Sequence, residues 1–192
     1  GASGGIGLGL YRNDLTSSMP TELGQLIQLE NLNLNWNEFE GSIPTEFGSL
    51  TYIQSGFGFR GNNLAGRLPT ELGEMTRLSR YLVFQSNDLV GSIPSEFGRF
   101  SLFTSLYRGG GCSYSSDVKV CAEDENYVAR EASTVFDRYI DMTENPKMLS
   151  TIPTQIGKFT RLGYFAQPFW DNVTGPLPSQ LGMWTALTSG FF

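Results

Sequence analysis

Four glutamates are the residues whose type could support catalysis, because paired carboxylates hydrolyse glycosidic bonds by acting as acid and base or nucleophile. They are Glu22, Glu46, Glu71 and Glu96. Each stands two residues after a proline in a phrase that recurs along the chain. A residue that returns at one fixed position of a repeat is expected to have a structural or solvated role. We therefore do not assign a hydrolase site to these acids.

Other catalytic and metal-binding chemistry is restricted by composition. The chain contains no histidine, which excludes Ser-His-Asp and Cys-His sites. Two cysteines without histidine make a poor zinc site. Asp117 and the acids at 123–125 lack the glycine and the spacing of a calcium loop. The glycine-rich start, residues 4–9, lacks the third glycine of a dinucleotide fingerprint. We expect no enzyme activity, no cofactor and no metal.

The glutamates belong to a six-residue phrase that organises the chain. Its proline is followed by Thr or Ser, then Glu or Gln, an apolar residue and Gly. The prolines are Pro20, Pro44, Pro69, Pro94, Pro153 and Pro178. Their separations are 24, 25, 25, 59 and 25 residues. A fixed period of this size predicts a solenoid, in which each unit buries its apolar edge against its neighbours. The spacing of 59 is one repeat of 25 plus 34 extra residues.

Within one unit, the residue pattern predicts a short strand followed by turns. Leu32 and Leu34 alternate with a polar residue, as in a strand with one buried face. Leu26 and Leu29 are three residues apart, as on one face of a helical turn.

One position shared by the units is seven residues before the proline, and it holds Asn13, Asn37, Asn62, Asn87 and Asp171. We expect these stacked side chains to bond the turn backbone that the next unit leaves open. Glycines four residues later, at 41, 66, 91 and 175, predict a positive-φ position.

The pattern L-x-x-L-x-L-x-x-N-x-L-x-G-x-I-P-x-x-L-G resembles the plant-type extracellular leucine-rich repeat. Such repeats occur in receptor-like kinase ectodomains and polygalacturonase-inhibiting proteins, and similar repeats occur in diatoms. The match covers residues 6–108 and 145–192. The resemblance implies an α/β repeat: a leucine-rich-repeat solenoid with a parallel β-sheet on the concave face and 3-10 turns on the convex face. In the third unit, Phe57 and Phe59 replace the strand leucines and alternate with Gly56 and Gly58.

The extra residues predict an insertion between two runs of repeats, with repeats at 1–108, an acidic insertion at 109–144 and continuing repeats at 145–192. From residue 122 to 142 the apolar side chains recur at helical spacing, which predicts one amphipathic helix of four to six turns. The segment could present a solvated helix face, form part of a ligand pocket as island domains do in some plant receptors, or have no folded role. Cys112 and Cys121 flank eight residues and either form a disulfide or remain thiols.

The resemblance implies binding of a protein, peptide or small extracellular ligand through the concave face, as part of a receptor or secreted inhibitor. Exposed aromatic residues and arginines are typical anchors of such interfaces. By register, the outward-facing positions include Tyr11, Arg12, Asn33, Asn35, Trp36, Arg60, Val83, Gln85, Phe169 and Trp170. The alternative is a structural or adhesive protein of a cell wall or matrix, with contact to polysaccharide.

The resemblance also implies an extracellular or cell-surface location, although no signal peptide is visible. Asn172 begins an N-x-T glycosylation sequon. The net charge of −6 argues against a nucleic-acid partner. No apolar run is long enough to span a membrane. Because no cysteine-bearing cap is present, we interpret the chain as a segment of a longer protein that carries receptor-like signalling repeats.

Overall fold

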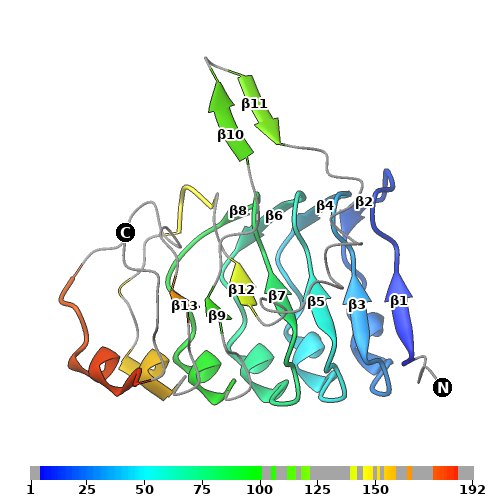
Figure 1. Cartoon of the computed structure of the whole chain (residues 1–192). Coiled ribbons are helices and arrows are strands. Elements are labelled where there is room, and N and C mark those ends of the chain that lie inside the picture. The colour runs from blue at the N-terminus through cyan, green and yellow to red at the C-terminus, as the bar shows by residue number, and fades with distance from the viewer. Residues whose placement is uncertain are drawn as a thin grey trace.

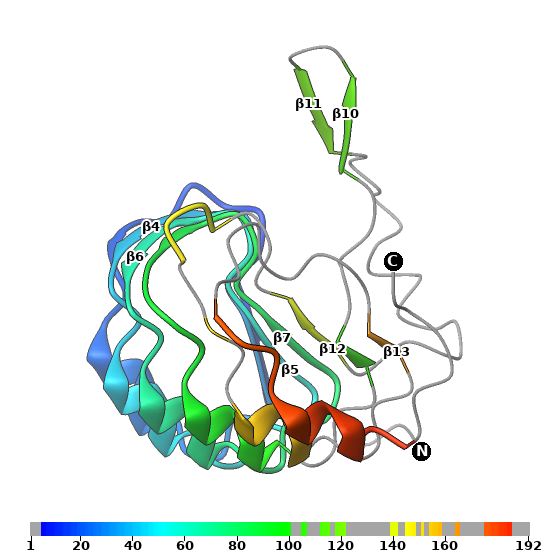
Figure 2. The same ribbon diagram turned by 90° about the vertical axis from the view of Figure 1, so that its left-hand side faces the viewer.

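The computed structural model shows a curved solenoid in which parallel strands form one side and short 3-10 turns form the opposite side (Figures 1 and 2). It describes residues 5–100, 105–106, 112–115, 118–121, 139–141, 145–148, 151, 154–158, 164–165 and 175–185. The predicted architecture of a concave sheet and convex 3-10 turns is confirmed. No helix among the described residues is long and apolar enough to cross a membrane.

The concave sheet contains five parallel strands in the order β1-β3-β5-β7-β12. Their bounds are Gly7–Gly9 (β1), Asn31–Asn33 (β3), Gly56–Gly58 (β5), Tyr81–Val83 (β7) and Tyr139–Asp141 (β12). A second parallel sheet, β2-β4-β6-β8, follows the ladder asparagines. Its strands are Thr16–Ser18 (β2), Glu38–Gly41 (β4), Asn63–Gly66 (β6) and Asp88–Leu89 (β8). Each unit thus crosses both sheets before it turns back.

The 3-10 turns begin directly after the prolines of the repeated phrase. They are Thr21–Gln25 (η1), Thr45–Ser49 (η2), Thr70–Glu74 (η3), Ser95–Arg99 (η4), Thr154–Lys158 (η5) and Ser179–Met183 (η6). Proline suits this place because its fixed φ, −61° at Pro44, starts the turn and its own carbonyl accepts the first bond, from Phe47 at 3.2 Å. Glu22, Glu46 and Glu71 lie exposed in these turns, and Glu96 is partly buried.

Buried asparagines tie each unit to the unit before it. The Asn62 Oδ1 atom accepts a hydrogen bond from the backbone N–H of Phe39 at 3.1 Å, and Nδ2 donates to the backbone oxygen of Leu34 at 3.1 Å. Nδ2 also donates to Phe59 of its own unit at 3.0 Å. Asn37 and Asn87 form the same pattern. The predicted ladder is confirmed at these positions, but its bonds run to the preceding unit and not to the next. Asp171 lies outside the described residues.

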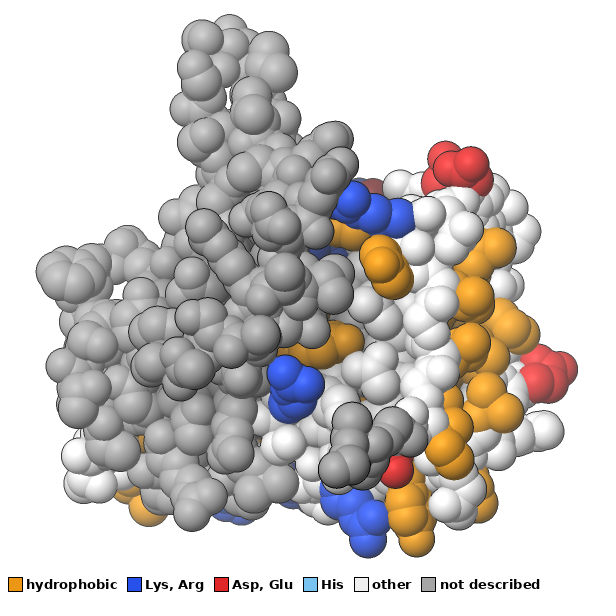
Figure 3. All heavy atoms as spheres, turned by 45° about the vertical axis from the view of Figure 1, so that its right-hand side comes forward, with side chains coloured by type: hydrophobic (Ala, Val, Ile, Leu, Met, Phe, Trp, Pro, Cys, Tyr) orange, Lys and Arg blue, Asp and Glu red, His pale blue; other side chains and the backbone are white. Residues whose placement is uncertain are grey.

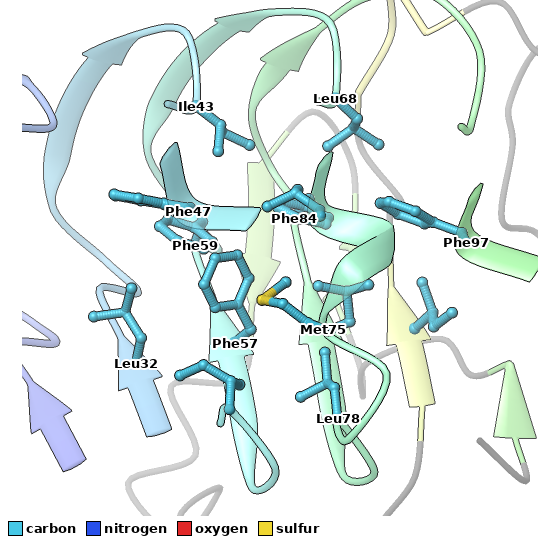
Figure 4. Close-up of a cluster of buried hydrophobic side chains, with 14 of the residues drawn as sticks. Leu32, Ile43, Phe47, Phe57, Phe59, Leu68, Met75, Leu78, Phe84 and Phe97 are labelled. Atoms are coloured by element: carbon cyan, nitrogen blue, oxygen red, sulfur yellow. The ribbon is translucent and has the colours of Figure 1, made fainter. Parts of the chain in front are cut away.

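The core between the sheets and the turns is rich in phenylalanine (Figure 4). Phe57 of β5 and Phe59, which follows this strand, are fully buried, and their ring centroids are 4.6 Å apart in an edge-on arrangement. Phe59 stacks on Phe84 at 5.8 Å, and Phe47 from η2 lies 6.1 Å from the rings of both Phe57 and Phe59. Aromatic rings therefore fill the space that leucines fill in the second unit, and the glycines between them lie on the concave face.

Apolar positions that are buried in later units are exposed in the first one. Leu10, Leu15 and Leu26 are 38%, 37% and 45% exposed, whereas the equivalent residues of the next unit, Leu34, Phe39 and Leu50, are 0%, 7% and 0% exposed. In the later units a preceding unit covers these positions. Apolar side chains consequently form a column on the N-terminal side of the solenoid (Figure 3).

The structure corrects the prediction for the end of the insertion. Residues 139–141, which we predicted as the last part of a helix, form β12 and pair in parallel with β7 beside it (Figure 1). Asn145 then takes the ladder position, because its Oδ1 accepts from Leu89 at 3.1 Å and its Nδ2 donates to Phe84 at 3.0 Å. Residues 122–138, the rest of the predicted helix, lie outside the described residues.

Three more described strands precede β12: one at the end of the first run of repeats and two in the insertion. Ser105–Leu106 (β9) pairs in parallel with Tyr164–Phe165 (β13), not with β7. Cys112–Ser115 (β10) and Val118–Cys121 (β11) form an antiparallel hairpin. The strand next to β7 is therefore β12, which follows the hairpin in the sequence. The repeat period predicted that β9, which precedes the hairpin, would take this place.

Removing a ladder side chain should destabilise the fold. We expect Asn62→Ala to lower the free energy of unfolding by about 3 kcal/mol, because it leaves a buried N–H and buried carbonyls unbonded. Asn13→Ala is the matched control. The side chain of Asn13 is exposed and, among the described residues, bonds only Leu10 and Tyr11 of its own unit, so its loss should change stability little. Urea unfolding followed by circular dichroism measures both values, and equal losses would contradict a role for the bonds between units.

The glycine that ends each phrase should be required wherever the next unit stacks on it. A Cβ atom at Gly48 would lie 2.6 Å from the backbone oxygen of Glu71, whereas a Cβ atom at Gly182 would meet nothing within 4 Å. We expect Gly48→Ala to lower the free energy of unfolding by about 1–3 kcal/mol through overpacking. Gly182→Ala should leave it nearly unchanged in the same unfolding experiment. A tolerated Gly48→Ala would show that the turns can separate.

Candidate concave binding surface

The sequence-predicted site residues divide into an accessible group and a buried group. Tyr11 and Trp36 are 45% and 37% exposed. Arg12 is exposed, and Asn33 and Asn35 are half-buried. Phe169 and Trp170 lie outside the described residues. The accessible members come from β3 and from the residues that follow β1 and β3, so the structure brings them together at one end of the concave sheet.

Arg60, Val83 and Gln85 are buried, which corrects the expectation that they face solvent. Their exposed fractions are 7%, 5% and 3%. The alternation of inward-facing and outward-facing residues along a strand predicted that these side chains lie on the outward face. It cannot predict which other residues cover that face. The concave surface is therefore open at β1 and β3 and covered at β7. We restrict the candidate binding surface to Tyr11, Arg12, Asn33, Asn35 and Trp36.

Trp36 is held in place by the following unit. The guanidinium carbon of Arg60 lies 4.8 Å from the centre of the Trp36 ring, a cation–π contact. A Cβ atom at Gly61 would lie 2.3 Å from the same ring, so the indole packs against this glycine. Trp36 itself has a φ of +56° and immediately precedes the ladder residue Asn37. Arg12, Gly61 and Ser86 share this place and also have positive φ values.

The glycines of β5 make room for side chains of the neighbouring strands. A Cβ atom at Gly56 would lie 2.0 Å from the ring of Tyr81, and one at Gly58 would lie 2.8 Å from Oδ1 of Asn35. Tyr81 therefore lies across β5, and its hydroxyl accepts a hydrogen bond from Nδ2 of Asn31 at 3.0 Å. These glycines stand out in the sequence, but Asn31 and Tyr81 are not among the predicted site residues, because a contact between residues 50 positions apart leaves no local signal.

Asn35 connects its own unit to the unit that follows. Its Oδ1 atom accepts a hydrogen bond from the backbone N–H of Arg60 at 2.7 Å. Its own backbone N–H donates to Oδ1 of Asn33 at 3.1 Å. In each side chain the atom that accepts from a backbone N–H must be the oxygen Oδ1. The other atom of each amide is therefore the nitrogen Nδ2. The surface is polar, uncharged along β3 and held rigidly.

Comparison with known proteins agrees with this architecture. The Leucine Rich Repeat family model matches residues 28–50. A search of curated proteins found no significant match. Among solved structures, the leucine-rich-repeat ectodomain of the Arabidopsis thaliana receptor kinase GASSHO1/SCHENGEN3, in complex with Casparian strip integrity factor 2, is 26% identical with a TM-score of 0.70. That alignment covers 95% of this chain and 17% of the receptor chain.

Two further Arabidopsis structures show the same fold. The receptor kinase HAESA, in complex with the peptide hormone IDA and a co-receptor, is 24% identical with a TM-score of 0.65, and the alignment covers 95% of this chain and 25% of that one. The complex of BIR3 and SERK2 gives 24% identity, a TM-score of 0.57 and coverage of 90% and 72%. The chain therefore spans a quarter or less of the first two relatives.

The repeat period, the two parallel sheets and the asparagine ladder define a leucine-rich-repeat solenoid. Together with the family match over residues 28–50, they show a leucine-rich-repeat fold that is similar to the fold of plant receptor-kinase ectodomains.

The hairpin brings the two cysteines opposite each other. Cys112 and Cys121 are paired residues at the open end of β10 and β11. Paired residues of antiparallel strands have Cα atoms about 4.5–5.5 Å apart, within the range that a disulfide spans. We predict that the bond forms in the oxidised protein. Intact mass should then increase by two hydrogen atoms on reduction, and an unchanged mass would contradict the prediction.

Proposed function

We propose that the chain is a non-catalytic recognition module that binds a protein or peptide partner through the concave surface formed by β1 and β3. The observation that carries the proposal is the placement of Trp36. Its ring is supported by Arg60 and Gly61 but remains 37% exposed, at the end of a row of half-buried asparagines. A rigid aromatic side chain with an arginine neighbour is a typical anchor of a protein interface.

The relatives support the same kind of partner. GASSHO1/SCHENGEN3 and HAESA were solved with Casparian strip integrity factor 2 and with a peptide hormone, respectively. Because these structures are receptor ectodomains, we propose that this chain also works outside the cell as part of a receptor or secreted protein. The sequon at Asn172 would then be accessible to glycosylation, although this residue lies outside the described part of the chain.

The proposal predicts that Trp36→Ala removes partner binding without unfolding the protein. The probe is a displayed library of random dodecapeptides, selected for binding to the wild-type chain. We expect the selected peptides to lose at least about tenfold in affinity for Trp36→Ala, in line with the loss of a central aromatic anchor. Circular dichroism and urea unfolding should show that the variant remains folded.

Tyr52→Ala provides the matched control. Tyr52 is 41% exposed and also has a cation–π partner, with the guanidinium carbon of Arg77 at 4.4 Å from its ring centre, but it lies in the loop before β5. Its replacement should not change peptide affinity. Equal losses for the two variants, or a library that yields no binder, would overturn the proposed function.

A further inference from the structure

The side-chain amides of Asn33 and Asn35 leave two hydrogen-bond donors available beside the open part of the concave face. Asn33 uses its Oδ1 atom to accept from the backbone of Asn35, and Asn35 uses its Oδ1 atom to accept from Arg60. Neither Nδ2 atom donates to another described residue, and neither is among the buried side-chain atoms that lack a partner. Both NH₂ groups therefore remain accessible.

The neighbouring strand leaves space for a ligand next to these donors. Gly9 of β1 pairs in register with Asn33, so the two positions share the concave face. A Cβ atom at Gly9 would meet no atom within 4 Å. On the other side, the in-register partner Gly58 is covered by the Asn35 amide, 2.8 Å from its Cβ position. The accessible side of Asn33 is therefore the one that faces β1.

The spacing of the donors matches an extended polypeptide. Asn33 and Asn35 are two residues apart on one run of extended chain, which separates their Cα atoms by about 6.6 Å. In an extended peptide the carbonyls that point to the same side also repeat every two residues, at about 6.6 Å. A peptide backbone that runs along β3 would therefore repeat its same-side carbonyls with the same spacing as these two residues, while its side chains reach Tyr11 and Trp36.

We propose that Asn33 and Asn35 bind two successive same-side backbone carbonyls of an extended peptide segment. The partner of the concave surface is then recognised through the carbonyl oxygens along one edge of its backbone. The inference depends on the proposed function, because it names the chemistry of the segment that this surface recognises. Since both amides are already fixed by backbone donors, little side-chain entropy is lost when the peptide binds.

Aspartate substitutions test the role of the donors directly. Asn33→Asp and Asn35→Asp keep the oxygen that accepts the structural hydrogen bond and replace only the accessible NH₂ group by an acceptor. Peptides selected on the wild-type chain should lose at least about tenfold in affinity for each variant, because a hydrogen bond is replaced by repulsion between two acceptors. The side-chain NH₂ signals of Asn33 and Asn35 in NMR spectra should also shift when the wild-type chain binds peptide.

Asn31→Asp is the matched control on the same strand. In Asn31 it is Nδ2 that is already bonded, to the hydroxyl of Tyr81. The substitution therefore introduces the same charge without removing an accessible donor, and affinity should change by less than about twofold. A loss equal to that of the other two variants would show that charge, and not the donor, determines binding, and would overturn the inference.

The remaining outcomes separate this inference from the proposed function. Peptide binding that depends on Trp36 but is unchanged in Asn33→Asp and Asn35→Asp would overturn only the carbonyl contact. Binding that is lost when the acidic residues of the selected peptides are replaced by their amides would show recognition of carboxylates, and it would also overturn this contact. A library without binders would overturn both.

Discussion

The hydrogen bonds of a buried asparagine in each unit are the interaction on which the solenoid depends. The side chain of Asn62 bonds the unit before its own through Phe39 and Leu34. It therefore satisfies backbone groups of two units that neither turn could pair alone. The residue before it must turn the chain into the left-handed region, as Gly61 does with a φ of +64°. The ladder thus sets the register of the units. It also sets the direction that the chain takes after each strand of the concave sheet.

That geometry also creates the candidate binding surface. Because the turn before each ladder asparagine is left-handed, the side chain at this place is directed toward the following unit. Trp36 consequently meets Arg60 and packs on Gly61. The same strand spacing brings Asn35 within 2.7 Å of the backbone N–H of Arg60. Contacts that hold the units in register therefore also orient the side chains available to a partner.

Periodicity predicted the parts of this structure that repeat. The strands at β3, β5 and β7, the 3-10 turns after the prolines and the positive φ values of Gly41 and Gly66 follow from the spacing of a few residue types. The burial of Val83 and Gln85 does not, because alternation defines a face but not what covers it. The place of Asn145 was also missed: it lies eight residues before Pro153, and the other ladder asparagines lie seven before theirs.

Residues that depart from the repeat are the ones that give the concave face its chemistry. Regular units would carry similar side chains on every strand and offer a partner no preferred position. Here Gly9 leaves open space on one side of Asn33, and Gly58 is covered by Asn35 on the other. The burial of Val83 and Gln85 removes β7 and the residues that follow it from contact. A ligand that follows the accessible donors must therefore lie over β1 and β3, so the irregular glycines confine binding to the end of the sheet where Trp36 is exposed.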